Sequence, residues 1–319
     1  DTTRPKRYRM VSKYYKETYG EKVYKLPVAL PLTCPNRDGS AGVGGCTFCG
    51  EIGAGYENRP AWMTVRMQLE ENIAHIGPKY KAKKFIPYYQ NFSNTYLNLD
   101  DFKSYIEQGC IDEAVGIAIA TRPDCIADEY LEILADIRKR FQKDIYIELG
   151  LQTVNYETLE KINRGHDLAQ FIDAVLRIKR YGFNITTHMI VNLPWDTMKD
   201  TIEGARILSA LGVDQVKLHA LYIVKNTLMA KWYQEGQFTL ISAEEYADRV
   251  VNFVRHLHSD IVLQRLVGRA PEDNTLFTNW SMGWWRVQDL IDDKLDELDA
   301  HQGDLCDYLN GKAVRKFID

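Results

Sequence analysis

Three cysteines near the start of the chain are the residues whose types and spacing point most directly to chemistry. Cys34, Cys46 and Cys49 lie in the segment Cys-Pro-Asn-Arg-Asp-Gly-Ser-Ala-Gly-Val-Gly-Gly-Cys-Thr-Phe-Cys. Three thiolates can bind three irons of a four-iron, four-sulfur cluster and leave the fourth iron open, whereas structural metal sites are normally closed by a fourth protein ligand. The set therefore predicts a reactive [4Fe-4S] cluster. The alternative is a zinc site completed by Cys110, Cys125 or a histidine.

The composition is that of a globular chain without a membrane segment. The 319 residues are 45 % hydrophobic and 26 % charged, and no run of about eighteen apolar residues occurs. Six unevenly spaced cysteines do not resemble a disulfide framework, and residues 1–9 do not resemble a signal peptide, so we expect a cytoplasmic protein. A net charge of −4 gives no overall indication of nucleic-acid binding. Locally, residues 1–25 predict a basic arm that packs on the surface or contacts RNA or phosphate.

Short apolar segments alternate with amphipathic helices from residue 26 to residue 225. The expected strands are Leu26–Leu32, Phe85–Tyr89, Ala114–Ala120, Ile145–Gln152, Phe183–Leu193 and Val213–Ala220. Six successive strand-helix units predict parallel strands, in a barrel or in an open sheet. Residues 226–319 predict helices, one strand at Ile261–Val267 and a Trp-rich segment. We therefore expect three parts, 1–25, 26–225 and 226–319.

Alternation along the expected strands separates a polar face from an apolar face. The polar positions of the fourth to sixth strands include Glu148, Gln152, His188, Asn192, Lys217 and His219. Helices should cover the apolar faces, so the polar faces should point together into a lumen. Because unpaired buried polar groups are costly, such a lumen should hold a polar ligand. The alternatives are a solvated sheet edge or ordinary polar layers in a packed barrel.

At Cys-Pro-Asn-Arg-Asp-Gly and Gly-Gly-Cys-Thr-Phe-Cys the chain resembles the radical S-adenosylmethionine (SAM) superfamily. More narrowly, it is similar to a bacterial subfamily related to the elongator catalytic subunit and to oxygen-independent coproporphyrinogen oxidase. The eleven residues between Cys34 and Cys46 exceed the superfamily's commonest spacing but suit this subfamily.

This resemblance extends to about residue 290 and implies an α/β fold. The fold would be a partial (β/α)6 TIM-like barrel with a C-terminal α/β extension that closes its open side. The resemblance also implies an enzyme that holds a [4Fe-4S] cluster on Cys34, Cys46 and Cys49 and cleaves SAM. A one-electron donor such as flavodoxin or ferredoxin would be its partner.

The resemblance further implies which residues contact SAM. Gln152 and Arg164 match a Gln at the end of the fourth strand and an Arg twelve residues later, which contact the methionine part. A guanidinium is a natural partner for its carboxylate. Additional expected contacts are Phe48, Gln90, Asn94, Glu148, His188, Asn192 and Leu221. His188 stands where the coproporphyrinogen relatives have Asp.

Cationic and aromatic residues near the strand ends are candidates for the substrate side, because barrel sites lie at the C-terminal ends of strands. The expected catalytic residues are Lys217, His219 and Tyr96. The expected substrate-binding residues are Arg122, Tyr222, Lys225, Arg265 and Arg269. Arg122 could instead tie down its loop, and charged strand ends are commonly only solvated.

The arm, the tyrosines and the elongator resemblance favour a tRNA or nucleotide substrate, ahead of a small anionic metabolite. The Trp-rich segment 279–285 is interpreted as packing in preference to recognition. Two rivals lack catalysis. One is a zinc-stapled binding module, and the other is a cluster that senses redox state.

Overall fold

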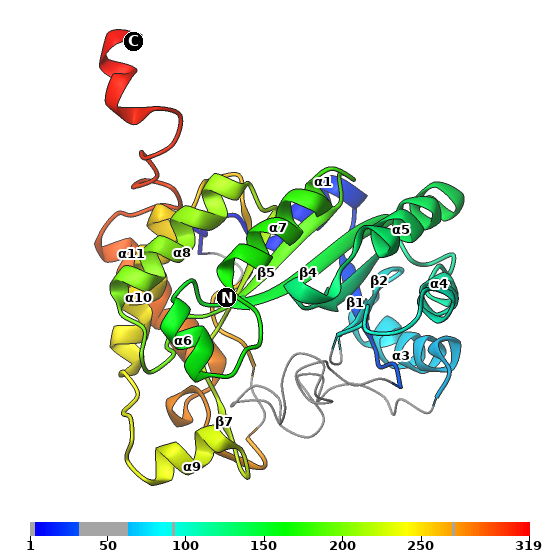
Figure 1. Cartoon of the computed structure of the whole chain (residues 1–319), viewed down its shortest axis with the longest axis horizontal. Coiled ribbons are helices and arrows are strands. Elements are labelled where there is room, and N and C mark those ends of the chain that lie inside the picture. The colour runs from blue at the N-terminus through cyan, green and yellow to red at the C-terminus, as the bar shows by residue number, and fades with distance from the viewer. Residues whose placement is uncertain (1–3, 32–62, 91–92, 270–271) are drawn as a thin grey trace.

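A curled parallel sheet is the central element of the computed structural model, which describes residues 4–31, 63–90, 93–269 and 272–319 (Figure 1). Its strand order is β1-β2-β3-β4-β5-β6-β8, and every neighbouring pair is parallel. The strands are β1 (Val23–Val28), β2 (Lys84–Tyr89), β3 (Gly116–Thr121), β4 (Asp144–Gln152), β5 (Asn184–Ile190), β6 (Gln215–His219) and β8 (Val262–Arg265). The predicted α/β fold with a partial barrel is confirmed, and the strand expected at Ile261–Val267 adds a seventh member to the same sheet.

The two edge strands of this sheet approach each other. Although β1 and β8 stand at opposite ends of the strand order, Lys25 Nζ in β1 donates to Gln264 Oε1 in β8 over 3.0 Å. Helix α1 (Val11–Tyr19) contacts both edge strands, and Met10 forms a parallel bridge with Leu263. The residues just before β1 therefore help to span the open side of the barrel.

Helices cover the outer face of the sheet, as the apolar alternation predicts. They are α3 (Val65–Tyr80), α4 (Leu99–Gln108), α5 (Asp128–Phe141), α6 (Tyr156–Lys161), α7 (Leu168–Lys179), α8 (Met198–Leu211), α10 (Ala243–His256) and α11 (Trp284–Glu297). Ile147 and Ile185 of the strands share one buried core with Phe171 and Phe253 of the helices. Thr64 caps the start of α3, since its side chain accepts from the Met67 backbone amide over 3.1 Å.

The inner face is closed below by aromatic residues. Tyr15 of α1 packs with Val23, Ile86, Ala118 and Tyr146, which lie toward the N-terminal ends of their strands. Small residues on β3 leave the space that this packing requires. A Cβ added to Gly116 would lie 2.9 Å from the Tyr146 ring. These residues form a layer below the polar part of the lumen, and we call this layer the aromatic plug.

The first strand begins earlier than expected. It spans Val23–Val28 instead of Leu26–Leu32, because these residues pair one for one with Lys84–Tyr89 in β2. The shift matters for the site, because it places Lys25 inside a strand.

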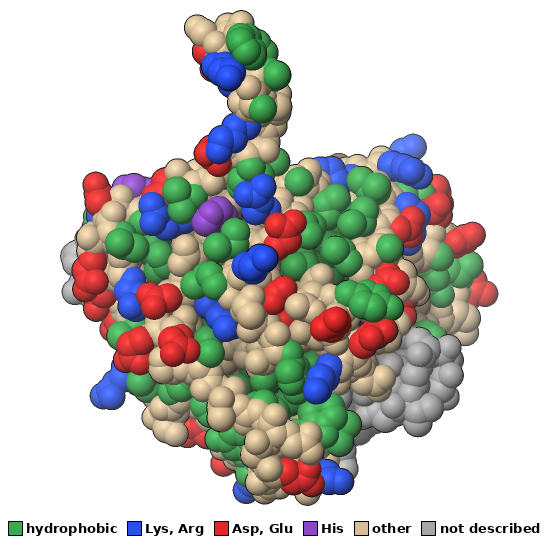
Figure 2. Space-filling view, turned by 60° about the vertical axis from the view of Figure 1, so that its left-hand side comes forward, with side chains coloured by type: hydrophobic (Ala, Val, Ile, Leu, Met, Phe, Trp, Pro, Cys, Tyr) green, Lys and Arg blue, Asp and Glu red, His purple; other side chains and the backbone are tan. Residues whose placement is uncertain are grey.

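The C-terminal extension adds a small second core beside the sheet. Strands β7 (Ile223–Val224) and β9 (Thr275–Phe277) form an antiparallel pair, followed along the chain by the short turn η2 (Asn279–Ser281). Helix α9 (Leu228–Gln234) joins this core through Met229, which packs with Leu193 and Leu221. The last turn, η3 (Lys312–Phe317), projects from the body (Figures 1 and 2).

The basic residues at the start of the chain lie against acidic residues of α11. Arg4 Nη2 is 2.9 Å from Asp293 Oδ1, and Lys6 Nζ is 2.7 Å from Asp292 Oδ2. Arg7 Nη1 lies 2.9 Å from an oxygen of Asp299, just beyond the helix. These pairs favour the interpretation of the arm as a surface-packed segment. No helix among the described residues is long and apolar enough to cross a membrane.

Candidate functional site

Seven residues from six strands meet in the lumen above the aromatic plug, and we call this group the lumen floor. Its members are Lys25, Tyr88, Glu148, His188, Lys217, His219 and Arg265. In β1, β2, β4, β5 and β6 the period-two alternation turns these side chains inward. In β8 a register shift opposite Lys217 brings Arg265 to the same face. The sheet register brings neighbours together, since His188 pairs with Lys217 and Lys217 pairs with Arg265. The polar lumen predicted from the sequence is present.

Glu148 is the central acceptor of the lumen floor. It is 1 % exposed and receives hydrogen bonds from Lys217 Nζ at 3.1 Å, His188 Nε2 at 3.0 Å and Lys25 Nζ at 3.3 Å. Burial by itself would raise the pKa of Glu148. The charges of Lys217 and Lys25 and the hydrogen bond from His188 outweigh burial and hold that pKa well below its usual range. Glu148 is therefore a carboxylate at neutral pH.

The pKa values of Lys217 and His188, two basic groups around Glu148, are lowered as well, which for a base favours the neutral form. Burial lowers the pKa of Lys217 well below its usual range; the Glu148 carboxylate opposes this shift, and Lys25 and Arg265 reinforce it. Burial and the charge of Lys217 also lower the pKa of His188 to about 4. A neutral imidazole at position 188 can donate its single N–H to Glu148.

Arg265 and His219 form a second contact within the lumen floor. Arg265 Nη2 lies 2.7 Å from His219 Nδ1, so the guanidinium donates and the imidazole accepts. Burial, together with the charge of Arg265, lowers the pKa of His219 well below its usual range. His219 is thus a neutral acceptor that orients the guanidinium without neutralising it.

Sequence reasoning missed three residues of this region. Lys25 was excluded because the first strand was expected to start one residue after it. Tyr88 was read as part of an apolar strand, although Lys25 Nζ lies 4.4 Å from its ring centroid and Lys217 Nζ lies 5.0 Å from it. Gln264, the partner of Lys25, lies in the strand that was assigned to the C-terminal extension. If β1 and β8 are given their observed bounds, two-residue alternation predicts that Lys25 and Gln264 face the lumen.

A second group lies at the C-terminal end of β4, around Gly150. Arg164 Nη2 donates to the Gly150 carbonyl oxygen over 2.6 Å, and His166 Nε2 lies 3.0 Å from the same oxygen. A Cβ added to Gly150 would lie 2.6 Å from Arg164 Nη2 and 3.0 Å from Gln152 Nε2. The structure therefore brings the predicted pair, Gln152 and Arg164, to one glycine. Gln152 itself has a left-handed backbone, with φ of 75°.

Two buried asparagines, which follow β2 and β5, retain hydrogen-bonding capacity. Asn94 donates its amide to the carbonyls of Tyr89 and Ala120 over 2.8 and 3.0 Å, while its Oδ1 has no partner among the described residues. Asn192 Oδ1 accepts from the Leu221 amide over 2.7 Å, while its Nδ2 likewise has no partner in the described part of the chain. Buried polar atoms of this kind are normally satisfied, so both are suited to contact a ligand.

The remaining predicted residues are more dispersed. Arg122 is buried and forms two hydrogen bonds with Asp124, at 2.9 and 3.1 Å, as expected of a residue that ties down its loop.

Tyr96 lines a separate groove with Cys125. Tyr222 is half-buried, and Lys225 and Arg269 are exposed. Gln90 directly follows β2, and its backbone N–H donates to the Val28 carbonyl over 3.3 Å.

The predicted cluster ligands Cys34, Cys46 and Cys49, and the predicted SAM contact Phe48, lie outside the described residues. Among the described residues, no three His, Cys, Asp or Glu side chains are grouped so that they could hold a metal ion. Cys110, Cys125 and Cys306 are half-buried.

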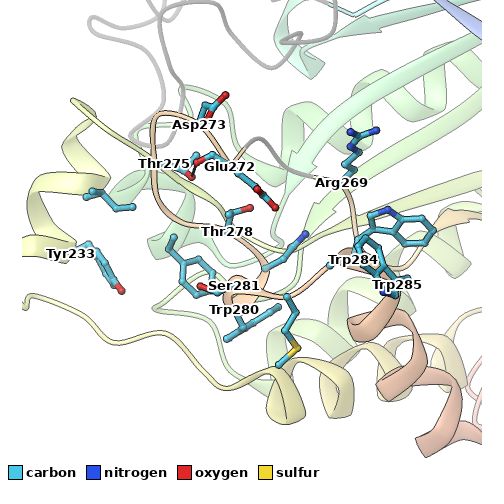
Figure 3. Close-up of a pocket in the computed structure, with 15 residues that line it drawn as sticks. Tyr233, Arg269, Glu272, Asp273, Thr275, Thr278, Trp280, Ser281, Trp284 and Trp285 are labelled. Carbon is cyan, nitrogen blue, oxygen red and sulfur yellow. Dashed lines mark hydrogen bonds between the residues drawn. The ribbon is translucent and has the colours of Figure 1, made fainter.

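A cleft of about 1450 Å³ lies in the C-terminal extension, where the chain continues beyond β8 (Figure 3). Tyr233 lies on one side of it, and Arg269, Trp284 and Trp285 lie together on the other. Trp284 and Trp285 are 43 % and 57 % exposed. Trp280, in contrast, donates to the Ile241 carbonyl over 2.8 Å. The packing interpretation of the Trp-rich segment thus fits Trp280 better than the other two.

The backbone of this cleft is unusual. Three successive residues without a glycine, Asn279, Trp280 and Ser281, have φ of 43°, 54° and 56°. Left-handed stretches of L-residues cost energy and persist where surrounding contacts fix them. Asn279 supplies one such contact, because its Nδ2 donates to the Gly268 carbonyl over 3.0 Å. A Cβ added to Gly283 would lie 2.3 Å from the Trp285 ring, so the ring lies directly against the backbone.

Comparisons with known proteins agree with this architecture. The protein of Bacillus subtilis (strain 168) named "Uncharacterized protein YtqA" is 32 % identical over 97 % of this chain and 96 % of its own length. The Escherichia coli (strain K12) protein YhcC is 32 % identical over 88 % of this chain and 89 % of its own. The solved structure of the archaeal Methanocaldococcus infernus Elp3 with an N-terminal deletion has a TM-score of 0.67 at 14 % identity, which indicates a shared fold. It matches over 88 % of this chain and 64 % of that chain.

Family models match most of the sequence. The model of the Radical SAM superfamily matches residues 35–208, and the model of the Radical_SAM C-terminal domain matches residues 213–297. The first match begins one residue after Cys34 and contains Cys46, Cys49 and the strands that carry Glu148, Gln152 and His188. The chain belongs to the radical SAM superfamily.

Proposed function

We propose that this protein is an enzyme that binds SAM beside a [4Fe-4S] cluster, cleaves it reductively and modifies a substrate by radical chemistry. The observation that carries the proposal is the arrangement around Gly150, where Gln152 and Arg164 converge on a position without a Cβ. Cys34, Cys46 and Cys49 are the proposed cluster ligands. When bound, the cluster supplies one electron that splits a sulfonium C–S bond of SAM, usually giving a 5′-deoxyadenosyl radical that takes hydrogen from a substrate.

The chain's own residues would bind and orient SAM. Arg164 is held by the Gly150 carbonyl and is the proposed partner of the SAM carboxylate, with Gln152 beside it. The Oδ1 of Asn94, which has no partner among the described residues, is suited to accept from the SAM amine. The Nδ2 of Asn192, which has no partner among those residues either, is suited to donate to an adenosine acceptor, close to Leu221.

Glu148 and His188, which the sequence predicts as SAM contacts, are here proposed to support the site without touching SAM. Glu148 already accepts from Lys25, Lys217 and His188, so its oxygens are largely occupied. We therefore assign the pair to the lumen floor beneath SAM, where they fix the two lysines. In such a buried site, fixed polar groups exclude water from a reactive intermediate.

The substrate would enter from the C-terminal ends of the strands and reach Lys217 and His219. A nucleotide, free or within a tRNA, and a small anionic metabolite are the two candidates. The pairing of the basic arm with α11 removes one reason for choosing RNA. On the face shown in Figure 2, basic and acidic side chains are interspersed, as expected for a surface without a dedicated nucleic-acid stripe. We therefore favour the small anionic metabolite as the substrate.

An anaerobic assay tests the proposal. The protein, reconstituted with iron and sulfide, is incubated with dithionite and SAM, and the nucleoside product is identified by mass spectrometry. We expect 5′-deoxyadenosine from the unmutated protein and none from Cys46→Ala. In the cytoplasm, a flavodoxin or ferredoxin would replace dithionite. Formation of 5′-methylthioadenosine instead would show that a different C–S bond breaks.

A glycine pair sharpens this assay. Gly150→Ala should push Arg164 and Gln152 aside and lower SAM affinity by at least about tenfold, as expected for loss of a charge-assisted contact. Gly77→Ala is the matched control, because an added Cβ there meets nothing closer than 3.8 Å. Affinity is measured by equilibrium dialysis. Bound zinc without SAM cleavage would favour the binding module, and a bound cluster without SAM cleavage would favour redox sensing.

A further inference from the structure

The lumen floor carries more positive than negative charge. Lys25, Lys217 and Arg265 supply three basic side chains, and Glu148 is the single carboxylate among the described residues that meets them. Uncompensated charge in a buried site is costly, so proteins normally pair it or reserve it for a ligand.

Arg265 is the least compensated of the three. Its Nη2 donates to the neutral His219 over 2.7 Å, and its Nε has no hydrogen-bond partner among the described residues. No ion pair joins it to a carboxylate in the described part of the chain. The two lysines, in contrast, both bond to Glu148.

The position of the Arg265 guanidinium is fixed by its surroundings. Gly268 leaves space for it, since a Cβ added there would lie 3.1 Å from Arg265 Cζ and 3.3 Å from both Nε and Nη2. The backbone at Gly268 is in turn held by Asn279, whose Nδ2 donates to the Gly268 carbonyl. A positively charged group that is both rigid and unsatisfied is pre-organised for an anion.

We propose that the lumen floor binds an anionic group of the substrate, a phosphate or a carboxylate, between Arg265 and Lys217. The inference rests on the proposed function, because it specifies the substrate class of the same barrel. Arg265 would donate to the anion through Nε, while His219 keeps the guanidinium in place. Lys217 would bridge the anion and Glu148, which fixes the substrate's charged end at the base of the lumen.

Anion binding can be measured without turnover. The full chain, reconstituted with its cluster under anaerobic conditions, is titrated with inorganic phosphate or with acetate in a calorimeter, against sodium chloride at equal ionic strength. We expect saturable binding of at least one of the two oxyanions. Phosphate binding alone would identify a phosphate group, and acetate binding alone would identify a carboxylate. Equal heats from chloride and from both oxyanions would overturn the proposal.

Variants then locate the bound anion. Arg265→Gln should weaken binding at least about tenfold, the usual size of a lost charge-assisted hydrogen bond. Gly268→Ala should weaken it as well, by displacing the guanidinium. Lys139→Met and Arg180→Gln, which remove exposed cations of the same types, should bind as the unmutated protein does. Unchanged binding in Arg265→Gln would contradict the assignment.

Thermal stability separates a binding role from a structural role. Because Arg265 is a part-buried cation that pairs with no carboxylate among the described residues, Arg265→Gln should melt at the same temperature as the unmutated protein, or higher, when no oxyanion is present. A structural residue would lower the melting temperature instead. If the unmutated protein cleaves SAM but binds no oxyanion, this inference fails alone. If it binds an oxyanion but does not cleave SAM, the proposed function fails alone.

Discussion

The lumen floor and the cleft of the C-terminal extension are built in opposite ways. The floor collects charged side chains from regular strands, and their positions follow from alternation and register. The cleft presents aromatic side chains from a left-handed turn and the start of a helix. The floor is buried and electrostatic, whereas Trp284 and Trp285 remain exposed. Mutations that break the ion pairs of Glu148 in the floor should therefore perturb global stability, whereas mutations at the cleft should mainly change local structure.

The largest effect is expected from Glu148→Gln. This change removes the carboxylate that pairs with Lys25 and Lys217, and it leaves the buried amine of Lys217 and the part-buried amine of Lys25 without that partner. Breaking a buried pair typically costs about 3–5 kcal/mol of unfolding free energy. Urea titration of the cluster-loaded protein measures it. Glu107→Gln, which breaks a part-exposed pair with Arg140, should cost far less. Equal costs would contradict the claim that the floor is electrostatically coupled.

A second prediction concerns acid sensitivity. His188 has a pKa of about 4 in the folded protein, below the ordinary value of 6.5. The unfolded chain therefore binds a proton more readily between these values, so stability falls as the pH drops from 7 to 5. His188→Gln should remove about 2 kcal/mol of that fall. Urea titrations at both pH values test this, with the exposed His75→Gln as control. An unchanged pH dependence would refute the prediction.

A smaller effect is expected at the anchor of the cleft. Trp280→Phe removes the hydrogen bond to the Ile241 carbonyl and reduces packing against Tyr246, whose ring centroid is 5.1 Å away. The loss should be about 1 kcal/mol in urea titration. Trp284→Phe should change stability by less than about 0.5 kcal/mol, since it alters an exposed residue. A larger cost at Trp284 would mean that the exposed side of the cleft also supports the fold.

The smallest global effect should come from Gly283→Ala. The added methyl would collide with the Trp285 ring, which must swing away into solvent. Melting temperature should hardly change, while tryptophan emission should shift to longer wavelength as the ring becomes hydrated. Gly77→Ala provides the control for both readouts. An unchanged emission spectrum would show that the ring does not depend on Gly283.

The same contrast explains what the sequence could predict. Glu148, His188, Lys217 and His219 were found because period-two alternation is visible without a structure. Lys25 lies one residue before the expected start of the first strand, and local sequence patterns define the ends of strands poorly. For the cleft there was no comparable signal, because three successive left-handed residues without glycine depend on tertiary contacts such as those of Trp280. The meeting of Arg164 and Gln152 at Gly150 followed from the resemblance and not from any local pattern.

The pairing of the first residues with α11 also sets an order of events during synthesis. Contacts such as Lys6 with Asp292 and Tyr8 with Asp292 join residues more than 280 positions apart. A ribosome must therefore synthesise the chain as far as α11 before the segment leading into α1 can be fixed in place. Contacts of such long sequence separation slow folding. Until α11 has been synthesised, the segment before α1 lacks its acidic partners. Chaperones that bind nascent chains would then encounter a barrel whose open side is not yet fully spanned.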